Sequence, residues 1–286
     1  MTQMQNEVSS LKFQTGDGWT LAGDIHVGPK PRKAIIISAG TGYPKGFYRH
    51  AAGWFADQGA VVLTYDYRGI GDSAPKTLVG SEIDYPDWGL DLSAATDAIE
   101  QRFPDLPIAH IAHSAGGKFI GLMPNHAKIQ RHAFLSVGTG YFGGHHRRNL
   151  PLEMYFWWGM GPYSLARHGY IKPIGGWRGQ ALPPKLFRTW RRWSHRRSYF
   201  QPELKTTLTS KFYNDVASPI RSWVFSDDPI ATSKSAQDVL DCYPNAASEL
   251  ITVSPPELGL KHVGHDGAFR KGRTAIWEQV WQFLNS

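Results

Sequence analysis

The feature that most constrains the fold of this chain is a series of short apolar runs, each followed by a glycine-rich turn or a helical pattern. One run contains Ile35, Ile36 and Ile37, and a second covers residues 60–67. Continuous runs of this length, rich in β-branched residues, are typical of strands buried on both faces of a parallel sheet. Further strands are predicted by the apolar runs at residues 106–113, 132–138, 221–225 and 248–254.

Helical patterns separate these strands, at residues 48–59, 86–103, 115–123, 235–243 and 274–286. The first ends in Gly59, a residue type that commonly stops a helix. The second has one apolar face, formed by Trp88, Leu92, Ala95 and Ile99, and the last has a stripe formed by Trp277, Trp281 and Leu284. At the N-terminal end, the Asp17-Gly18 turn predicts a hairpin or a pair of edge strands. Strands that alternate with helices predict an α/β fold, with a mainly parallel sheet covered by helices on both faces.

The length of 286 residues suits one large α/β domain, or one such domain with an insertion. The net charge of +7 is concentrated in residues 139–210, which hold 12 Lys or Arg against two Asp or Glu. The same segment carries five of the 11 tryptophans. We therefore expect a core made of residues 1–138 and 211–286, interrupted by a basic, aromatic-rich insertion at residues 139–210.

Cysteine content and hydropathy indicate the compartment. Cys242 is the only cysteine, so no intrachain disulfide and no zinc site of the Cys-x-x-Cys type can form. The first 13 residues contain no apolar core of a secretory signal peptide, and no run of about 18 apolar residues occurs. We expect a cytoplasmic protein without a transmembrane segment.

The stretch Ile-Ala-His-Ser-Ala-Gly-Gly at residues 111–117 places Ser114 between a predicted strand and a predicted helix. This is the context of the G-x-S-x-G turn that presents the nucleophile of serine hydrolases. Ala112 stands where that motif has glycine, a departure of one methyl group, and Gly116 matches. The alternative is that Ser114 is only a helix N-cap, and the short motif does not by itself decide between them.

Candidate partners for Ser114 follow two later strands. Asp227 and Asp228 come directly after residues 221–225, and His262 and His265 follow residues 248–254. Carboxyl ends of parallel strands meet at one edge of a sheet, where ligands bind. The order serine, acid, histidine is the chain order of the triad in hydrolases with this type of turn. The residues alone leave open which acid and which histidine would serve.

Five blocks resemble the α/β-hydrolase superfamily over nearly the whole chain: SAGTGYPKGFY, YDYRGIGDS, HSAGG, DDPIA and VGHDGAF. They are similar to a bacterial branch related to serine aminopeptidases, monoglyceride lipases and esterases. The resemblance implies an α/β-hydrolase fold with a helical cap insertion and a Ser-His-Asp triad. Its D-P-x-A pattern selects Asp228, with Asp227 as a neighbour that caps or tunes the turn. Its G-H-x-G pattern selects His265, with His262 as the alternative.

The resemblance also indicates the oxyanion hole. One N–H donor is expected from Ala115, the residue after the nucleophile. The second is expected from Thr41, because the Ala-Gly-Thr-Gly stretch at residues 39–42 is similar to the H-G-x-G loop of related lipases. Gly42 takes its place if the register shifts by one residue. We expect structural functions for Asp266 and for the glycine-rich block at residues 66–73, whose Arg68 is expected to form an ion pair.

The stretch at residues 182–200 interleaves arginines with aromatic residues. Such a pattern fits nucleic-acid binding, docking on anionic lipid, or a cap with aromatic side chains toward an acyl pocket. Because α/β-hydrolases commonly carry a cap at this point of the chain, we favour the cap and expect no nucleic-acid partner. The cap hypothesis predicts contact between the aromatic residues and the Ser114 site. The histidines of the insertion at residues 139–210, at positions 145, 146, 168 and 195, have few carboxylates nearby in the sequence. We therefore expect no metal and no cofactor.

Together these patterns predict a serine hydrolase that cleaves small-molecule carboxylic esters through an acyl-enzyme. An acyltransferase or a peptidase or amidase with the same triad is the main alternative, followed by a non-catalytic protein that binds anionic ligands. Dehalogenases and epoxide hydrolases are disfavoured because both need an aspartate in place of Ser114. We predict no particular oligomeric state, acyl group or leaving group.

Overall fold

The computed structural model describes residues 7–208 and 211–286. Residues 1–6, part of the N-terminal segment with no expected signal core, and residues 209–210, the expected end of the insertion, lie outside the described residues. An eight-stranded sheet has the order β1-β2-β4-β3-β5-β6-β7-β8. β3 to β8 run parallel to one another, whereas β2 runs antiparallel to both of its neighbours. The strands are β1 (Glu7–Gln14), β2 (Thr20–Val27), β3 (Lys33–Ser38), β4 (Ala60–Tyr65), β5 (Ile108–His113), β6 (Ile129–Leu135), β7 (Ile220–Phe225) and β8 (Ser248–Val253).

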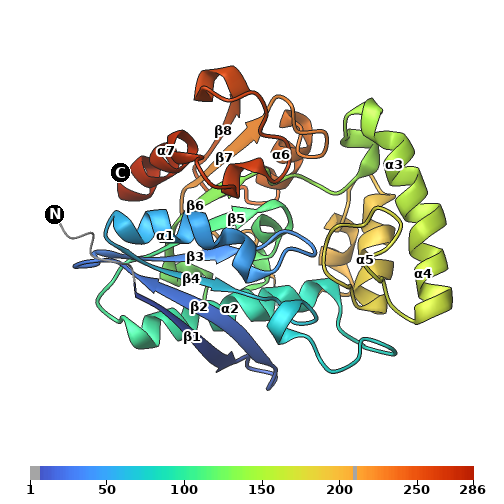
Figure 1. Cartoon of the computed structure of the whole chain (residues 1–286), viewed down its shortest axis with the longest axis horizontal. Helices are drawn as coiled ribbons and strands as arrows, with labels where there is room; N and C mark the ends of the chain where they lie inside the picture. Colours follow the sequence, from blue (N-terminus) through green and yellow to red (C-terminus); the bar gives the residue numbers. More distant parts are fainter. Residues whose placement is uncertain (1–6, 209–210) are drawn as a thin grey trace.

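Helices lie on both faces of this sheet, and a further group, α3 to α5, lies to the right of it in Figure 1. The α-helices are α1 (Arg49–Asp57), α2 (Trp88–Arg102), α3 (Leu150–Met154), α4 (Gly161–His168), α5 (Pro184–Ser194), α6 (Ser233–Leu240) and α7 (Thr274–Asn285). α1 and α7 pack against each other on the sheet, α2 packs on β1, β3 and β4, and α6 packs beside β7 and β8. The expected α/β fold, with a mainly parallel sheet between helices, is confirmed.

Burial explains why the strands could be recognised from sequence. Ile35, Ile36 and Ile37 on β3 are each 0% exposed, and every residue of β4 and β5 is buried as well. The predicted apolar face of α2 is also buried, and Trp277 and Leu284 of α7 lie in the core. At the N-terminal end, β1 and β2 form an antiparallel hairpin whose turn contains Gly18 at φ +84°.

One predicted element is wrong. The α-helix expected over residues 115–123 is replaced by two short 3-10 helices, Ser114–Lys118 and Ile120–Leu122. Glycines in the segment weaken an α-helix, and Pro124 prevents its continuation. The glycines also allow close packing, since a Cβ on Gly121 would lie 2.3 Å from the ring of Tyr213.

The glycine-rich block after β4 is a structural turn, as expected. Buried Arg68 pairs with Asp91 and with Asp17, each at 2.7 Å. Gly69 and Gly71 have φ values of +82° and +50°, conformations that favour glycine. The turn therefore joins the tip of the β1–β2 hairpin to α2.

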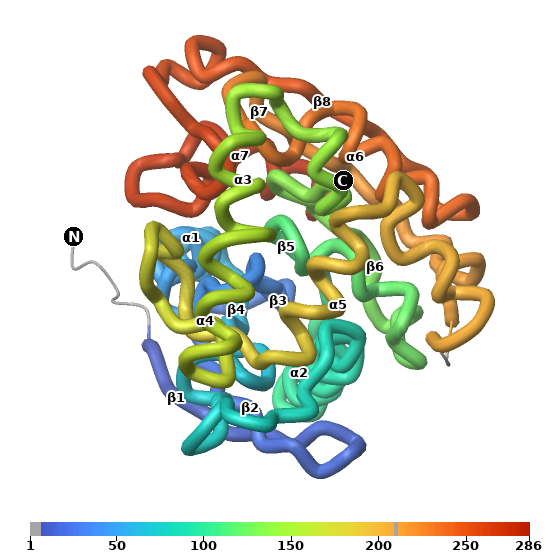
Figure 2. The backbone as a smooth tube through the Cα atoms, turned by 90° about the vertical axis from the view of Figure 1, so that its right-hand side faces the viewer, coloured from blue at the N-terminus to red at the C-terminus, as the bar shows by residue number. Residues whose placement is uncertain are grey.

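The segment after β6 forms a separate layer. α3, a π-helical turn at Tyr155–Met160 and α4 run as one continuous helical segment, and α5 packs beside it. Figures 1 and 2 show α3, α4 and α5 together on one side of the molecule, in front of the sheet when seen from that side. Within the described residues, no helix is both long enough and apolar enough to span a membrane.

Candidate active site

Ser114 stands at a sharp turn directly after β5, as the first residue of the 3-10 helix Ser114–Lys118. Its φ of +49° lies in the left-handed region, which non-glycine residues rarely occupy. The neighbouring glycines are required by close packing: a Cβ on Gly116 would lie 2.6 Å from the Ser38 carbonyl oxygen, and one on Gly117 would lie 2.7 Å from Val137. Ala112, in contrast, is accommodated with 0% exposure in the core. The turn therefore forms although alanine replaces the first glycine of the motif.

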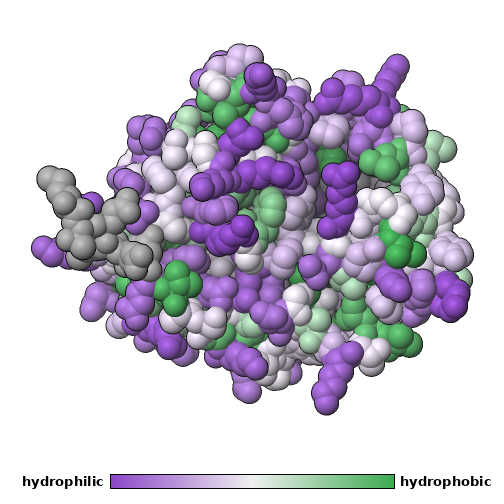
Figure 3. Space-filling view, viewed as in Figure 1, coloured by the Kyte–Doolittle hydropathy of each residue, from purple (hydrophilic) through white to green (hydrophobic). Residues whose placement is uncertain are grey.

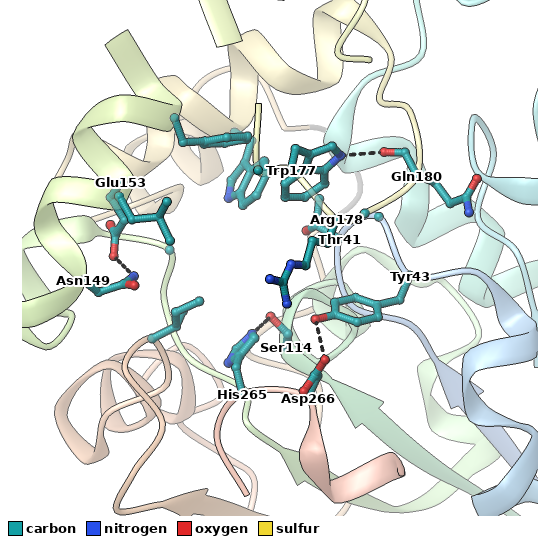
Figure 4. Close-up of a pocket in the computed structure, with 18 of the residues that line it drawn as sticks. Thr41, Tyr43, Ser114, Asn149, Glu153, Trp177, Arg178, Gln180, His265 and Asp266 are labelled. Atoms are coloured by element: carbon teal, nitrogen blue, oxygen red, sulfur yellow. Dashed lines mark hydrogen bonds between the residues drawn. The ribbon is translucent and has the colours of Figure 1, made fainter. Parts of the chain in front are cut away.

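Three side chains from different loops form a continuous hydrogen-bonded relay. The His265 Nε2 atom lies 2.9 Å from Ser114 Oγ, and His265 Nδ1 lies 2.9 Å from Asp228 Oδ2. Because an ionised carboxylate only accepts, Nδ1–H donates to Asp228 and Nε2 accepts the Ser114 hydroxyl proton. Figure 4 shows the Ser114–His265 pair on one side of a cavity, with Trp177 across from it. This arrangement can move a proton away from Ser114.

Asp228 is held in its ionised form inside the protein. Its side chain is 0% exposed, and its Oδ1 accepts the backbone N–H groups of Ile230 and Ala231 at 2.8 and 3.0 Å. Burial by itself would raise the pKa of Asp228. The neighbouring His265 and the two N–H donors outweigh burial, so the pKa lies below its ordinary value.

Asp227 and His262 form a second pair that does not reach Ser114. Asp227 accepts the backbone N–H groups of Val263 and Gly264 at 2.9 and 3.0 Å, and it contacts His262 Nδ1 at 2.5 Å. The His262 side chain is 73% exposed. Asp227 thus stabilises the loop that carries the histidine of the relay, whereas Asp228 contacts that histidine directly.

His113 is a site residue that the sequence analysis missed. Its Nδ1 accepts the Tyr48 hydroxyl at 2.8 Å, and its Nε2–H donates to the His265 carbonyl at 3.0 Å. The Tyr48 oxygen also accepts the Gly40 N–H at 2.9 Å. Burial, and secondarily the nearby His265, lower the pKa of His113 to about 3, so the ring stays neutral. His113 therefore ties the loop after β3 to the backbone of His265. A histidine beside Ser114 in a buried strand was the only sequence signal.

N–H groups that could bind an oxyanion lie beside Ser114. Ala115 is the second residue of its 3-10 helix, and the first N–H groups of a helix have no acceptor within it. Across the described part of the chain, the hydrogen bonds do not engage the N–H of Thr41 or of Gly42. Thr41, Gly42 and Ser114 line the same cavity. The N–H groups of Thr41 and Gly42 are therefore both candidates for the second oxyanion donor, beside that of Ala115.

The cavity beside Ser114 has a volume of about 720 Å³. Much of its wall is aromatic and comes from the segment after β6, with Tyr155, Phe156, Trp157, Trp177 and Trp190. These rings pack on one another, for example Trp157 on Trp190 with centroids 4.9 Å apart. Aromatic residues of residues 139–210 thus line the same cavity as Ser114, which is the placement that the cap hypothesis predicts.

The insertion also touches the loop that carries the candidate oxyanion donors. The Gln180 N–H donates to the Gly42 carbonyl at 2.7 Å. A Cβ on Gly42 would lie 2.6 Å from the Trp177 ring, so this close contact requires glycine. Movement of the segment around Trp177 would therefore disturb the loop.

The outer side of the insertion is different. Met154, Trp158 and Tyr163 are between 46% and 61% exposed on the α3–α4 segment. Figure 3 shows apolar groups at the surface on the side of the molecule where Figure 1 places these helices. The segment thus presents apolar side chains both to the cavity and to the outside.

The remaining candidates have structural partners. Asp266 pairs with Arg270 at 2.9 Å, and both residues line the cavity beside Ser114. His145 contacts Glu153 at 2.7 Å, and Glu153 also accepts from Asn149. Among the residues that the structure describes, no group of three or more His, Cys, Asp or Glu could hold a metal ion.

Comparisons with known proteins agree with this architecture. Residues 29–139 match the family model described as "Serine aminopeptidase, S33". No curated protein sequence matches the chain. A soluble variant of monoglyceride lipase from Saccharomyces cerevisiae, in complex with a substrate analog, has a TM-score of 0.67 at 13% identity over 99% of this chain and 96% of that chain.

Two esterase structures are similar in the same way. A thermostable carboxyl esterase from Bacillus coagulans, in complex with glycerol, has a TM-score of 0.63 at 16% identity over 97% of this chain and 98% of that chain. An esterase from Pyrococcus furiosus has a TM-score of 0.59 at 18% identity, with 98% and 92% covered. At these identities the likeness concerns the fold. The chain therefore has the α/β-hydrolase fold, and its residues 29–139 are similar to the serine aminopeptidase family.

Proposed function

We propose that this protein is a serine hydrolase that cleaves carboxylic esters, with Ser114 as nucleophile, His265 as general base and Asp228 as the acid that orients it. The observation that carries the proposal is the unbroken relay from Asp228 through His265 to Ser114, which opens onto a cavity lined by aromatic and polar side chains. The fold likeness to esterases and a lipase supports the same reaction class.

In the proposed mechanism, His265 Nε2 takes the hydroxyl proton as Ser114 Oγ attacks the ester carbonyl. The oxyanion of the tetrahedral intermediate accepts the N–H groups of Ala115 and of Thr41 or Gly42. Each such donor is worth about 2.7–4 kcal/mol in the transition state. Asp228 holds the tautomer and stabilises the imidazolium, which then gives its proton to the leaving alcohol. Water, activated by His265, releases the acyl group from Ser114.

We propose further that residues 139–210 act as a cap over this site. The helix α5 supports the assignment, because Leu186, Phe187 and Trp193 are buried whereas Arg188 and Arg192 are exposed. The apolar side of α5 therefore packs inside the protein. The rings that face Ser114 then shape an acyl pocket, and nucleic acid is not needed to explain the basic residues.

The protein would act in the cytoplasm on small-molecule esters. Its one cysteine, Cys242, is 9% exposed and has no partner for a disulfide in the chain. Proteins of oxidising compartments more often carry disulfides. Locating a tagged copy of the protein by cell fractionation tests this assignment.

The central test replaces Ser114 by alanine and measures hydrolysis of p-nitrophenyl acetate and butyrate. We expect kcat to fall by about 10⁴-fold or more, because nucleophile and base act as a unit. His265→Ala should lose activity to a similar extent, whereas the matched control His262→Ala should retain most of it. A fluorophosphonate probe should label the wild-type protein and not Ser114→Ala. Full activity of purified Ser114→Ala would contradict the proposal.

A peptidase or amidase is the second candidate, and the match to the serine aminopeptidase family favours it. The same relay can attack an amide, since the leaving amine takes its proton from His265. Aminoacyl p-nitroanilides and p-nitrophenyl esters, compared on one enzyme preparation, separate the two activities. A kcat/KM that is higher for the anilides would replace esterase by peptidase as the main function.

A further inference from the structure

A buried lysine lies in the candidate active site and takes no part in the proposed mechanism. Lys118 ends the 3-10 helix that begins at Ser114, and it lines the same cavity as Ser114. Its side chain is 3% exposed. Lysines are almost never fully buried unless they are paired, so this position calls for a partner.

The protein supplies Lys118 with little to neutralise its charge. Its Nζ donates to the Tyr199 hydroxyl at 3.3 Å and lies 4.7 Å from the centre of that ring. Within residues 7–208 and 211–286, no carboxylate forms an ion pair with Lys118. An ammonium group has three N–H donors, and the bond to Tyr199 uses one of them.

A second buried polar group, the Thr139 hydroxyl, lines the same cavity. Thr139 lines the cavity and is 4% exposed, and its hydroxyl oxygen has no hydrogen bond to the described protein. The next residue, Gly140, approaches so closely that a Cβ on it would lie 2.8 Å from the Tyr199 hydroxyl. The loop after β6 therefore runs beside the hydroxyl to which Lys118 donates.

The energetics favour an anion at this place. A buried charge without a counterion is costly, and a buried hydroxyl loses its hydrogen bonds to water. Burial lowers the pKa of Lys118 to about 7. A carboxylate that accepts from both groups would offset these costs. It would also give a partner to the Thr139 hydroxyl and to the remaining N–H donors of Lys118, on a wall that combines aromatic rings with polar side chains.

We propose that Lys118 and Thr139 form an anion subsite, which binds a carboxylate carried by the ester substrate several bonds away from the carbonyl that Ser114 attacks. This inference rests on the proposed function. A 3-10 helix rises about 2 Å per residue, which places the Lys118 backbone about 8 Å along the helix from Ser114. Monoesters of short dicarboxylic acids have a suitable reach.

The first experiment compares p-nitrophenyl monoesters of succinic, glutaric and adipic acid with the corresponding methyl p-nitrophenyl diesters, which lack the charge. We expect the wild-type enzyme to prefer at least one monoester over its diester in kcat/KM. Lys118→Met, which keeps the length of the side chain, should lower this ratio by about tenfold or more, mainly through KM. Thr139→Val, a nearly isosteric change, should lower the ratio less. It tests the subsite independently if Lys118→Met does not fold.

Two control variants separate the subsite from general charge effects. Lys185→Met removes an exposed lysine of α5 that pairs with Glu82 at 3.2 Å, and it should leave the ratio as it is in the wild type. Arg178 is exposed and also lines the cavity, with its side chain directed inward in Figure 4. If Arg178→Met lowers the ratio and Lys118→Met does not, the anion binds to Arg178 and the proposal is overturned.

A binding measurement distinguishes this inference from the proposed function. Calorimetric titration of glutarate into Ser114→Ala should show binding that is lost in Ser114→Ala/Lys118→Met and weakened in Ser114→Ala/Thr139→Val. Binding through Lys118 in a protein that hydrolyses no ester would support the subsite while contradicting the esterase. Ester hydrolysis with equal ratios in wild type, Lys118→Met and Thr139→Val would contradict the subsite alone.

Discussion

Two adjacent aspartates in this protein do different work although they share a loop. Asp228 contacts His265 from inside the protein, and Asp227 accepts two backbone N–H groups of the loop around Val263. Both are carboxylates after the same strand, so their difference arises only from the direction in which each side chain leaves the backbone.

Replacing each aspartate by asparagine separates these functions. Asp228→Asn should lower kcat by about 10⁴-fold, because an amide N–H facing Nδ1 favours the wrong tautomer of His265. Asp227→Asn should act mainly on stability, since it weakens hydrogen bonds to the loop. Ester hydrolysis and thermal melting of both variants provide the measurement. An equal loss of kcat in the two variants would contradict the assignment of Asp228 as the acid that orients His265.

His113 acts as a positioning residue in this geometry, because its ring is hydrogen-bonded to the His265 carbonyl and to Tyr48 and not to the Ser114 hydroxyl. His113→Phe should lower kcat by between about 10- and 100-fold with a smaller change in KM, since a small displacement of the base disturbs the relay. His113→Gln keeps an N–H donor near the Nε2 position and should recover part of the loss. A change confined to the melting temperature would indicate a purely structural function.

At the scale of elements, the short helix after β5 shows what the turn at Ser114 requires. Gly116→Ala should destabilise the protein by about 1–3 kcal/mol, because the added methyl group would lie 2.6 Å from the Ser38 carbonyl oxygen. Ala112→Gly, which restores the common motif, should cost only about 0.5–1 kcal/mol. Urea denaturation of both variants measures the two costs. A larger loss for Ala112→Gly would mean that the alanine methyl, rather than the glycine, holds the turn.

Strands could be predicted from the sequence more completely than the other elements. Their signal is local, because a continuous apolar run has few alternatives to a buried strand. The segment after Ser114 was predicted as an α-helix because its periodicity fits one. Contacts with Ser38 and Tyr213, distant in sequence, were needed to show that it is broken into 3-10 turns. The π-helical turn at Tyr155–Met160 had no sequence signal that we recognised.

For the molecule as a whole, the free energy of unfolding should depend on pH in a way that reflects the burial of Lys118. Burial lowers the pKa of Lys118 from 10.5 to about 7. Between these pH values the unfolded chain binds more protons than the folded protein, so this group makes the free energy of unfolding rise with pH. Tyr199, its neighbour, does not titrate in this window, because burial raises its pKa well above the ordinary value.

Lys118→Met should therefore remove part of the increase in stability between pH 7 and pH 10. Urea denaturation of wild type and variant at several pH values measures the difference, and Lys185→Met is the control for loss of an exposed charge. Identical pH dependence in the wild type and in Lys118→Met would show that Lys118 keeps an ordinary pKa in the folded protein.

The layered α/β architecture, the position of Ser114 at a strand end and the aromatic, basic character of residues 139–210 could all be predicted from the amino-acid sequence. These properties follow from apolar runs, turns and composition, which are local. The three-dimensional packing was needed to show that His265 joins Asp228 to Ser114 while Asp227 pairs with His262, and that Lys118 is buried beside the site. The Ser114 loop lies more than a hundred residues before the loops of Asp228 and His265, so the geometry of the relay depends on how these loops pack at the carboxyl ends of the strands.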